Sequence, residues 1–336
     1  MANAITETPT PEPPKSPPLD PSPTLSAIES DGLTRYFGKT RVVDRLHLKV
    51  PAGRVTALLG LNGAGKTTTI RMMMGLLAPT RGSCRTLDTD AQSLGPDQLS
   101  RIGYLVEGHY LPSWMTVHQL AKFCRSHQAR WNQERFDSIV DHFAVSVQQK
   151  CGRISRGQRA GVALASVLAA DVELLILDDP ALGLDPVSRR ALNETLVDFA
   201  GHDEGRQRTV LLSTHLLDDV ERIADDVAVM IGGQLLVHTT LADFHARVSR
   251  YAISDFKERD SGFPASIGGV VECRSVGDEL VLTVADAARD TIDQLQRHFA
   301  CDVEQLPTTL SDRVIAYLSR DRQSEFQDPG DQSQGE

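Results

Sequence analysis

The stretch Gly60–Thr68, which reads G-L-N-G-A-G-K-T-T, constrains the fold more than any other part of this chain. It fits the phosphate-loop pattern G-x-x-x-x-G-K-[ST]. The residues before it, 55–59, have the composition of a short buried strand, and residues 70–77 have the apolar spacing of a helix. A strand, a Gly-rich loop and a helix in this order predict an α/β domain that binds phosphate groups. The flanking strand and helix argue against the alternative, a chance Gly-rich turn.

The loop has residues suited to each part of a phosphate chain. Gly60, Gly63 and Gly65 let the backbone wrap closely, so that its N–H groups face an anion. The helix that begins near Lys66 adds the positive end of its dipole. The Lys66 ammonium can reach terminal phosphates, and the Thr67 hydroxyl can bind Mg²⁺.

Length and composition restrict the class of protein. The 336 residues have room for two domains, and hydrophobic and charged contents of 40% and 24% are ordinary for a soluble globular protein. The formal net charge of −10 argues against a nucleic-acid-binding surface over the whole molecule, although not against a local basic patch. Five widely spaced cysteines without C-x-x-C indicate neither a zinc site nor a disulfide framework, which fits a reducing cytosol. No apolar run approaches the roughly 18 residues that span a bilayer, and we expect no signal peptide.

Composition also changes along the chain. Eight of the seventeen prolines lie between Pro9 and Pro23, so we expect residues 1 to about 30 to form a disordered Pro-rich tail. A helical pattern from 116 to about 150 predicts an all-helical insert, and the pattern changes again after about residue 248. The expected parts are a nucleotide-binding domain over 31–245 with its helical insert at about 112–170, a small α+β domain over 249–320, and a polar, disordered tail over 321–336.

Two acidic residues follow a strongly apolar strand. Residues 174–177 read L-L-I-L and run directly into Asp178 and Asp179. Such a run is typical of a strand buried in a parallel sheet, and the carboxyl ends of such strands are where open α/β sheets bind ligands. Asp178 can hold Mg²⁺ beside Thr67, and Asp179 can orient or deprotonate a water. A helix-capping acid pair is the alternative, but a phosphate loop needs a metal-binding acid from a neighbouring strand.

Three further signals are weak on their own. Tyr36 and Phe37 form an aromatic pair that could stack on a nucleotide base, although an aromatic residue in a strand is more often part of the core. Ser155 stands where the N-cap of a helix would stand. His215 follows the expected strand 209–213 and could reach a phosphate, although a single histidine there is usually a surface residue.

Together, these motifs resemble those of the ATP-binding subunits of ABC transporters over roughly residues 31–245. The resemblance rests on six elements in family order, which are the phosphate loop, the strand ending at Glu107, the Ser155-Arg156-Gly157-Gln158 signature after the helical insert, the strand with Asp178-Asp179, Gly183-Leu184-Asp185 and Thr214-His215. The chain is most similar to single-domain subunits of exporters whose permease is a separate chain, and the small C-terminal domain is similar to theirs. The resemblance implies a P-loop ABC-type ATPase domain with a mixed sheet and a helical subdomain.

The resemblance also implies roles for individual residues. Phe37 would stack on the base, and the phosphates would be bound by Gly60, Asn62, Gly63, Ala64, Gly65, Lys66, Thr67 and Thr68. Mg²⁺ would be held by Thr67, Asp178 and Glu107, and hydrolysis would involve Asp179, His215 and Glu107. The ATP of a second subunit would be covered by Ser155, Gly157 and Gln158, and Asp185 would link the two sites.

The family works as a dimer that sandwiches two ATP molecules and drives a membrane permease. We therefore expect a cytoplasmic protein that is peripheral on the inner face of the membrane through a separately encoded permease, without a nucleic-acid partner, and with a C-terminal domain that is dispensable for ATP binding. The main alternative is a soluble ABC-type ATPase acting in DNA repair or on the ribosome, but such relatives tend to carry tandem ATPase domains, zinc modules or long coiled-coil insertions. A GTPase is disfavoured because the chain has no Asn-Lys pair for reading guanine.

Three positions depart from the family pattern. Glu107 stands where the family generally has Gln, and its charge changes the balance of the site. Arg156 replaces the first Gly of the signature's usual Gly pair. Asp179 replaces the usual catalytic Glu, and a carboxylate withdrawn by one methylene predicts slow hydrolysis rather than lost ATP binding.

Overall fold

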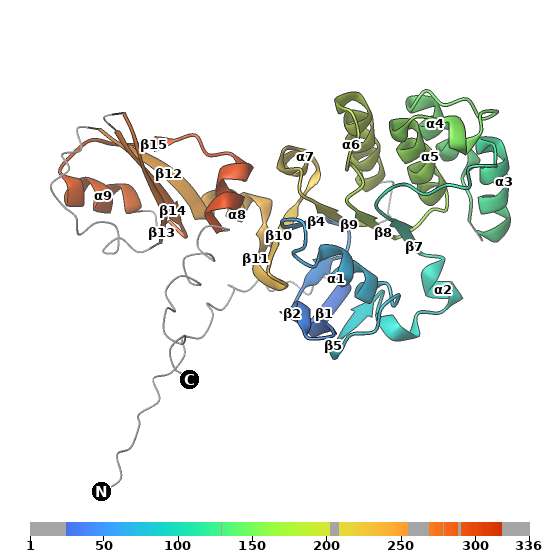
Figure 1. Cartoon of the computed structure of the whole chain (residues 1–336), viewed down its shortest axis with the longest axis horizontal. Helices are drawn as coiled ribbons and strands as arrows, with labels where there is room; N and C mark the ends of the chain where they lie inside the picture. The colour runs from blue at the N-terminus through green and yellow to red at the C-terminus, as the bar shows by residue number, and fades with distance from the viewer. Residues whose placement is uncertain are drawn as a thin grey trace, which may run out of the picture.

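The computed structural model describes residues 25–317, apart from residues 129, 202–207, 255–268, 278 and 288–289. Figure 1 shows a body built around sheets, a group of helices on one side of it, and a C-terminal β-rich part on the other. The two expected tails lie outside the described residues, except for residues 25–30.

A six-stranded sheet forms the centre of the molecule. Its order is β11-β10-β4-β9-β8-β7, and only the β10–β11 hairpin pairs antiparallel. The strands are β4 (Val55–Leu59), β7 (Ile102–Leu105), β8 (Leu174–Asp178), β9 (Thr209–Thr214), β10 (Asp226–Ile231) and β11 (Gln234–Thr240). Every residue of β4, β8 and β9 is buried, as the apolar runs predict for strands covered on both faces. The carboxyl ends of four parallel strands therefore carry the phosphate loop, Glu107, the acid pair and His215 to one edge.

An antiparallel sheet and one helix cover one face of the central sheet. The strands are β1 (Ser26–Phe37), β2 (Thr40–Leu46), β3 (Lys49–Pro51), β5 (Arg81–Thr86) and β6 (Thr89–Asp90), followed by the short helices η1 (Ala91–Ser93) and α2 (Pro96–Leu99). Helix α1 (Lys66–Met73) buries Ile70, Met72 and Met73 in a core shared by both sheets.

The predicted start of folding near Asp31 is wrong by five residues. Strand β1 begins at Ser26, because Ala27 and Ile28 are buried where β1 pairs with β3 and β5. The proline-dense stretch ends at Pro23, so nothing prevents residues 26–30 from joining a sheet.

Helices cover the other face of the central sheet. They are α3 (Val117–His127), α4 (Gln133–His142), the short η2 (Cys151–Arg153), α5 (Arg156–Leu168) and α6 (Pro186–Ala200). The helical insert has no core of its own, because its apolar side chains pack in one cluster with Leu175, Leu177 and Leu212 of the sheet. The mixed α/β architecture with a helical insert is thus confirmed.

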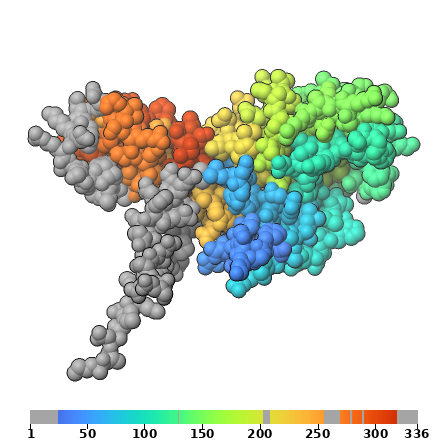
Figure 2. Space-filling view, in the orientation of Figure 1, coloured from blue at the N-terminus to red at the C-terminus, as the bar shows by residue number. Residues whose placement is uncertain are grey.

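The C-terminal part continues directly from the central sheet. After α7 (Leu217–Ile223) and the β10–β11 hairpin come α8 (Leu241–Arg247), β12 (Val248–Ile253), β13 (Val270–Val276), β14 (Glu279–Ala285), α9 (Thr291–Phe299), β15 (Val303–Leu306) and a helix over 310–317. The strands form an antiparallel sheet in the order β13-β14-β12-β15, in which β12 was not predicted. In Figure 2 the orange and red C-terminal residues lie against the yellow part of the chain.

One hydrophobic core joins the C-terminal part to the strand before the phosphate loop. Leu59 of β4 belongs to the same buried cluster as Phe244 of α8 and Leu310, Val314 and Tyr317 of the last helix. A second, separate cluster packs α9 against the C-terminal sheet. The expected boundary near residue 249 therefore divides a continuous core. In the part of the chain that the structure describes, no helix has both the length and the hydrophobicity needed to cross a bilayer.

Candidate functional site

The phosphate loop is pressed between two strands. A Cβ atom added to Gly60 would lie 2.4 Å from the carbonyl oxygen of Met230, and one added to Gly65 would lie 2.6 Å from that of Val42. Gly65 also has φ 99°, a left-handed backbone that a side chain disfavours. These two glycines are required by close backbone approach as well as by the turn. The turn between β10 and β11 also holds the loop, because the Gly233 N–H donates to the carbonyl oxygen of Ala64 at 3.2 Å.

The phosphate loop combines free N–H donors and a lysine ammonium at the start of α1. Gly65 is the N-cap of α1 and has no side chain, so no side-chain oxygen caps the N–H groups of the first turn. Lys66 is only 6% exposed, and its Nζ donates to the carbonyl oxygens of Gly60 at 2.8 Å and Leu61 at 3.3 Å. Burial lowers the pKa of Lys66, and three nearby carboxylates, those of Asp179, Asp178 and Glu107, raise it.

Asp178 is fixed by two hydroxyl groups on one oxygen. Its Oδ1 accepts hydrogen bonds from Thr67 Oγ1 at 3.1 Å and from Ser213 Oγ at 2.8 Å. The side chain is buried at the carboxyl end of β8, directly opposite Ser213 in the parallel ladder. The structure thus brings together two of the three residues predicted to hold a metal, and a hydroxyl and a carboxylate are oxygen ligands of the kind Mg²⁺ takes.

Asp179 has an unusual backbone and a defined partner. Its φ is 47°, in the left-handed region that Asp tolerates better than most residues. Its Oδ1 lies 2.9 Å from Nδ1 of His215. Its own N–H points back to β9, 3.1 Å from the Ser213 carbonyl oxygen and 3.2 Å from Ser213 Oγ. The acid and the histidine predicted to act in hydrolysis are therefore adjacent.

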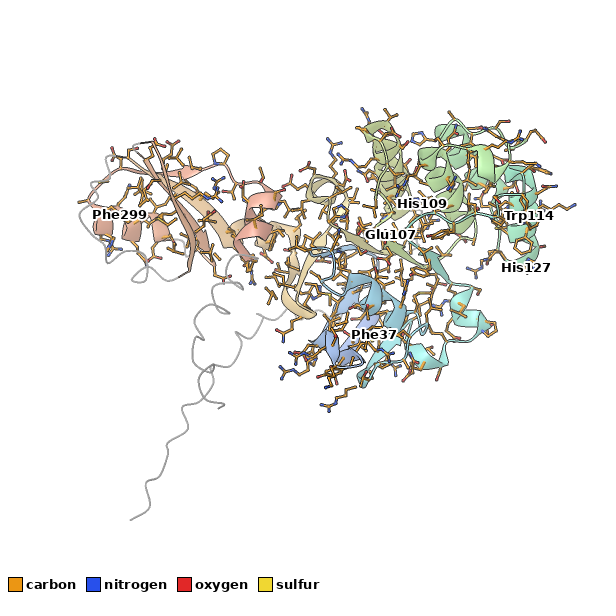
Figure 3. The ribbon with its side chains drawn as sticks, in the orientation of Figure 1. Phe37, Glu107, His109, Trp114, His127 and Phe299 are labelled. Carbon is orange, nitrogen blue, oxygen red and sulfur yellow. The ribbon has the colours of Figure 1, made fainter. Side chains whose placement is uncertain are left out.

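Glu107 and Phe37 border the same region with more exposed side chains. Glu107 follows β7 and lies near the centre of the molecule, close enough to Lys66 to raise the pKa of that ammonium (Figure 3). The Phe37 ring is 48% exposed, and the Arg35 guanidinium stands 4.8 Å from its centroid. Tyr36, the other aromatic candidate, is less exposed. Phe37 thus offers a ring surface for stacking.

The signature residues have local structural roles in this chain. Ser155 is confirmed as the N-cap of α5, since its Oγ accepts from the Gln158 N–H and Gln158 Oε1 accepts from the Ser155 N–H. A Cβ on Gly157 would lie 1.9 Å from Ser188 Oγ, so this glycine lets α5 approach α6. Figure 1 shows α5 with α3 and α4, away from α1. The hydrogen bonds described for Ser155 and Gln158 join these residues to each other and to Ala144, and none of them reaches the phosphate loop of the same chain.

Asp185 caps α6. Its carboxylate accepts from the N–H groups of Val187 and Ser188 at 3.0 Å each and from Ser188 Oγ at 2.6 Å. The Ser188 bonds lower the pKa of Asp185. The predicted link between two sites would have to coexist with this cap.

Ser213 and His109 are site neighbours that the sequence did not reveal, and Gly183, part of a predicted motif, has a packing role that the sequence did not reveal. Ser213 contacts both acids, and a polar residue inside the apolar strand T-V-L-L-S-T was an available signal. His109 is 1% exposed with φ 49° and lies close to Glu107, and burial lowers its pKa despite the nearby Pro180 carbonyl (Figure 3). A Cβ on Gly183 would lie 2.4 Å from the Arg156 guanidinium. Arg156, the signature residue that differs from the family pattern, therefore covers the turn after Asp178 and Asp179.

Comparisons with known proteins identify the family to which the chain is similar. Residues 43–182 match the family model described as ABC transporter. The chain is 32% identical over 244 residues to the bacitracin transport ATP-binding protein BcrA of Enterococcus faecalis, with 71% of this chain and 77% of that protein covered. It is 34% identical over 244 residues to the daunorubicin/doxorubicin resistance ATP-binding protein DrrA of Streptomyces peucetius, with 69% and 72% covered.

Solved structures share the fold. A structure of an ATP-binding subunit of an ABC transporter aligns with a TM-score of 0.59 at 24% identity, covering 66% of this chain and 92% of that one. The dimeric ATP-binding cassette MJ0796 bound to ADP and Pi aligns with a TM-score of 0.55 at 18% identity, covering 64% and 98%.

Proposed function

The chain belongs to the ABC transporter family as an ATP-binding, ATP-hydrolysing subunit that powers a membrane exporter, and on this premise we propose which residues bind ATP and perform its hydrolysis. One observation carries the proposal. At one edge of the central sheet, the phosphate loop, the Thr67–Asp178 contact and the Asp179–His215 pair meet at the carboxyl ends of β4, β8 and β9. The binding groups and the candidate hydrolytic groups are thus adjacent.

Phosphate binding uses groups that point into the loop. The uncapped N–H groups at the start of α1 and the Lys66 ammonium supply hydrogen-bond donors and positive charge. Lys66 exchanges its contacts with the Gly60 and Leu61 carbonyl oxygens for phosphate oxygens. The base stacks on the exposed Phe37 ring, which Arg35 steadies by its cation–π contact.

The residues around Asp178 fit a magnesium ion. Thr67 Oγ1 and the Asp178 carboxylate are hard oxygen donors already 3.1 Å apart, and among the described residues no hydrogen bond reaches Asp178 Oδ2. Glu107 adds a second carboxylate to this set of donors. When bound, Mg²⁺ neutralises charge on the phosphate oxygens.

Hydrolysis rests on Asp179, with His215 as its partner. The Asp179 carboxylate orients a water and accepts its proton, and the bond to His215 holds the carboxylate in place. Since Asp is one methylene shorter than the usual Glu, the carboxylate is withdrawn by about 1 Å, and such a displacement costs on the order of 10²-fold in rate. We therefore propose slow turnover and a long-lived closed state.

We propose that two subunits close around ATP. Ser155 is exposed at the start of α5, and its described side-chain hydrogen bond is to its own helix rather than to the phosphate loop, so we propose that a second subunit brings it to a nucleotide. Ser155→Arg is expected to block closure and to leave ATP binding by the monomer nearly intact. Sedimentation of the Asp179→Asn protein with and without ATP measures closure, and a monomer under both conditions would contradict the dimer.

The permease is proposed to dock on the segment after β7. Tyr110 and Trp114 are 83% and 68% exposed there, and large exposed apolar side chains mark interaction surfaces. Figure 3 shows Trp114 at the outer side of the helical group. The printed names of BcrA and DrrA, which concern bacitracin transport and resistance to daunorubicin and doxorubicin, support export as the direction. The protein would then lie on the inner face of the membrane.

Titration calorimetry with ATP tests the site directly. Lys66→Ala removes a charge-assisted contact to phosphate and is expected to weaken ATP binding by at least about tenfold. Lys122→Ala, an exposed lysine on α3, is the matched control for removing one positive charge. If Lys66→Ala binds ATP as tightly as the parent and Lys122→Ala, the nucleotide site is not at this loop.

A further inference from the structure

We propose that Ser213 is a positioning residue for ATP hydrolysis, because its single hydroxyl group holds both Asp178 and Asp179. The proposal rests on the nucleotide site described above. Ser213 does not reach a bound nucleotide in this scheme. It acts through the Asp178 carboxylate and the Asp179 backbone.

The placement of Ser213 follows from the parallel ladder. Strands β8 and β9 are in register with Asp178 opposite Ser213, and the side chain of Ser213 is fully buried. Its hydroxyl therefore has few possible partners. It donates to Asp178 Oδ1 at 2.8 Å and accepts from the Asp179 N–H at 3.2 Å. One group thus satisfies a side chain and a backbone on successive residues.

The first bond fixes the direction of the Asp178 carboxylate. The terminal torsion of an Asp side chain has a broad, shallow profile, so hydrogen bonds decide which oxygen faces the phosphates. Thr67 also donates to Oδ1, but Thr67 is on the phosphate loop and is itself proposed to bind the metal. Ser213 is on a buried strand and supplies a donor that does not move with the loop. Its bond keeps Oδ1 occupied, while no described hydrogen bond reaches Oδ2.

The second bond fixes the backbone of Asp179. A non-glycine residue at φ 47° is held in a conformation that L-amino acids rarely adopt, so surrounding contacts must maintain it. The Asp179 N–H is shared between the carbonyl oxygen and the hydroxyl of Ser213, at 3.1 and 3.2 Å. This anchor aims the carboxylate at His215. Because the Asp side chain is short, its position depends more on the backbone than that of a Glu would.

A purely structural role predicts a different outcome from a positioning role. If Ser213 only satisfies buried polar groups, its loss lowers stability but leaves the response to Mg²⁺ unchanged. If it orients Asp178, its loss reduces the gain in ATP affinity that Mg²⁺ confers. If it also orients Asp179, kcat falls while KM for ATP changes little.

The isosteric pair Ser213→Thr and Ser213→Val separates these outcomes. Both add the same bulk to the strand, and only Thr keeps the hydroxyl. A hydrogen bond to a charged group is worth enough that we expect Ser213→Val to lower kcat by about 10- to 100-fold relative to Ser213→Thr, with KM within about threefold. Calorimetry with ATP in Mg²⁺ and in EDTA should show a smaller Mg²⁺-dependent gain for Val than for Thr.

Two controls keep the result interpretable. The Thr and Val variants cannot be compared if they unfold below the assay temperature. In that case Ser213→Ala, which adds no bulk, is compared with the wild type instead. Wild type and Lys66→Ala are titrated alongside. Loss of ATP binding in the wild type would remove the proposed function itself. Wild-type binding together with equal kcat and equal Mg²⁺ response in the variants with and without the hydroxyl would overturn the role of Ser213.

Discussion

Nδ1 of His215 lies 2.9 Å from Oδ1 of Asp179, so the two side chains proposed to act in hydrolysis are bonded to each other. Because a carboxylate only accepts hydrogen bonds, Nδ1 must carry the proton. A neutral His215 then has an unprotonated Nε2, which repels a phosphate oxygen. His215 can therefore donate to a phosphate and keep Asp179 only as the imidazolium, and phosphate contact is coupled to the charge of this pair.

Substitutions at Asp179 should change turnover in opposite directions. Asp179→Glu restores the missing methylene and is expected to raise the rate of phosphate release by up to about 10²-fold. Asp179→Asn keeps the size but cannot accept a proton, so hydrolysis should nearly vanish. Steady-state phosphate release by the three proteins, with equal ATP affinity as the control, is the measurement.

The left-handed backbone of Asp179 gives a reason why Asp179→Glu could lower the rate of hydrolysis instead of raising it. Asp occupies this region more readily than Glu, so a site built around the shorter acid would lose activity on lengthening. A wild-type rate above that of Asp179→Glu would show that φ 47° already brings the carboxylate into place. Equal rates for wild type and Asp179→Asn would remove Asp179 from the mechanism.

The strands, loop and helix that form the candidate ATP site could be predicted because their sequence signals are local. The glycines of 60–65, the apolar strand before Asp178 and the cap at Ser155 each depend on a few neighbouring residues, and β4, β8 and α5 lie where those patterns indicate. Strand β12 and the true start of β1 were missed because each is stabilised by pairing with distant strands rather than by its own pattern.

The packing role of Gly157 within its own chain could not be predicted from the sequence, because it depends on contact with Ser188 of α6, which is distant in the sequence. Gly157→Ala would place a methyl group 1.9 Å from Ser188 Oγ and 2.6 Å from Ser188 Cβ, so α5 and α6 must separate. We expect a loss of about 1–3 kcal/mol and a lower melting temperature. Gly95→Ala, whose methyl group would meet only Gln98 Oε1 at 3.3 Å, is the control. Equal melting temperatures for the two variants would show that the helices are not in contact.

The shared core makes the last helix important for the nucleotide domain. Leu310 is 1% exposed and belongs to the cluster that contains Leu59, whereas Leu295, fully buried, belongs to the separate cluster of the C-terminal sheet. Both Leu→Ala substitutions delete similar volume, at a cost of about 2–5 kcal/mol. Only Leu310→Ala is expected to destabilise the strand that leads into the phosphate loop.

Hydrogen exchange of the β4 amides, read by mass spectrometry, distinguishes the two variants. Faster exchange in Leu310→Ala than in Leu295→Ala would support the shared core, and unchanged β4 exchange in both would contradict it. The dispensability of the C-terminal domain for ATP binding stays a prediction. Because Phe244 is buried in the shared core, removing residues after about 250 exposes it. A truncated chain must therefore be checked for folding before its affinity for ATP is measured.

Stability should fall in mild acid because of His238. This residue lies on β11 opposite Ala228, and burial lowers its pKa from 6.5 to about 4. Its Nε2 has no hydrogen-bond partner within the described ranges, so nothing compensates a buried charge there. Since the unfolded chain takes up the proton near pH 6.5 and the folded chain only near 4, the neutral ring contributes its full stability above pH 6.5.

That stability is lost progressively as pH falls from about 6.5 towards 4, by at most about 3 kcal/mol. His238→Gln removes the titrating ring, so its melting temperature should decline less than that of the wild type between pH 7.5 and 5. His127→Gln, at an exposed histidine on α3, is the matched control for replacing a histidine. If wild type and His238→Gln lose the same number of degrees over this interval, His238 is solvated in the folded protein and its burial does not govern the acid response.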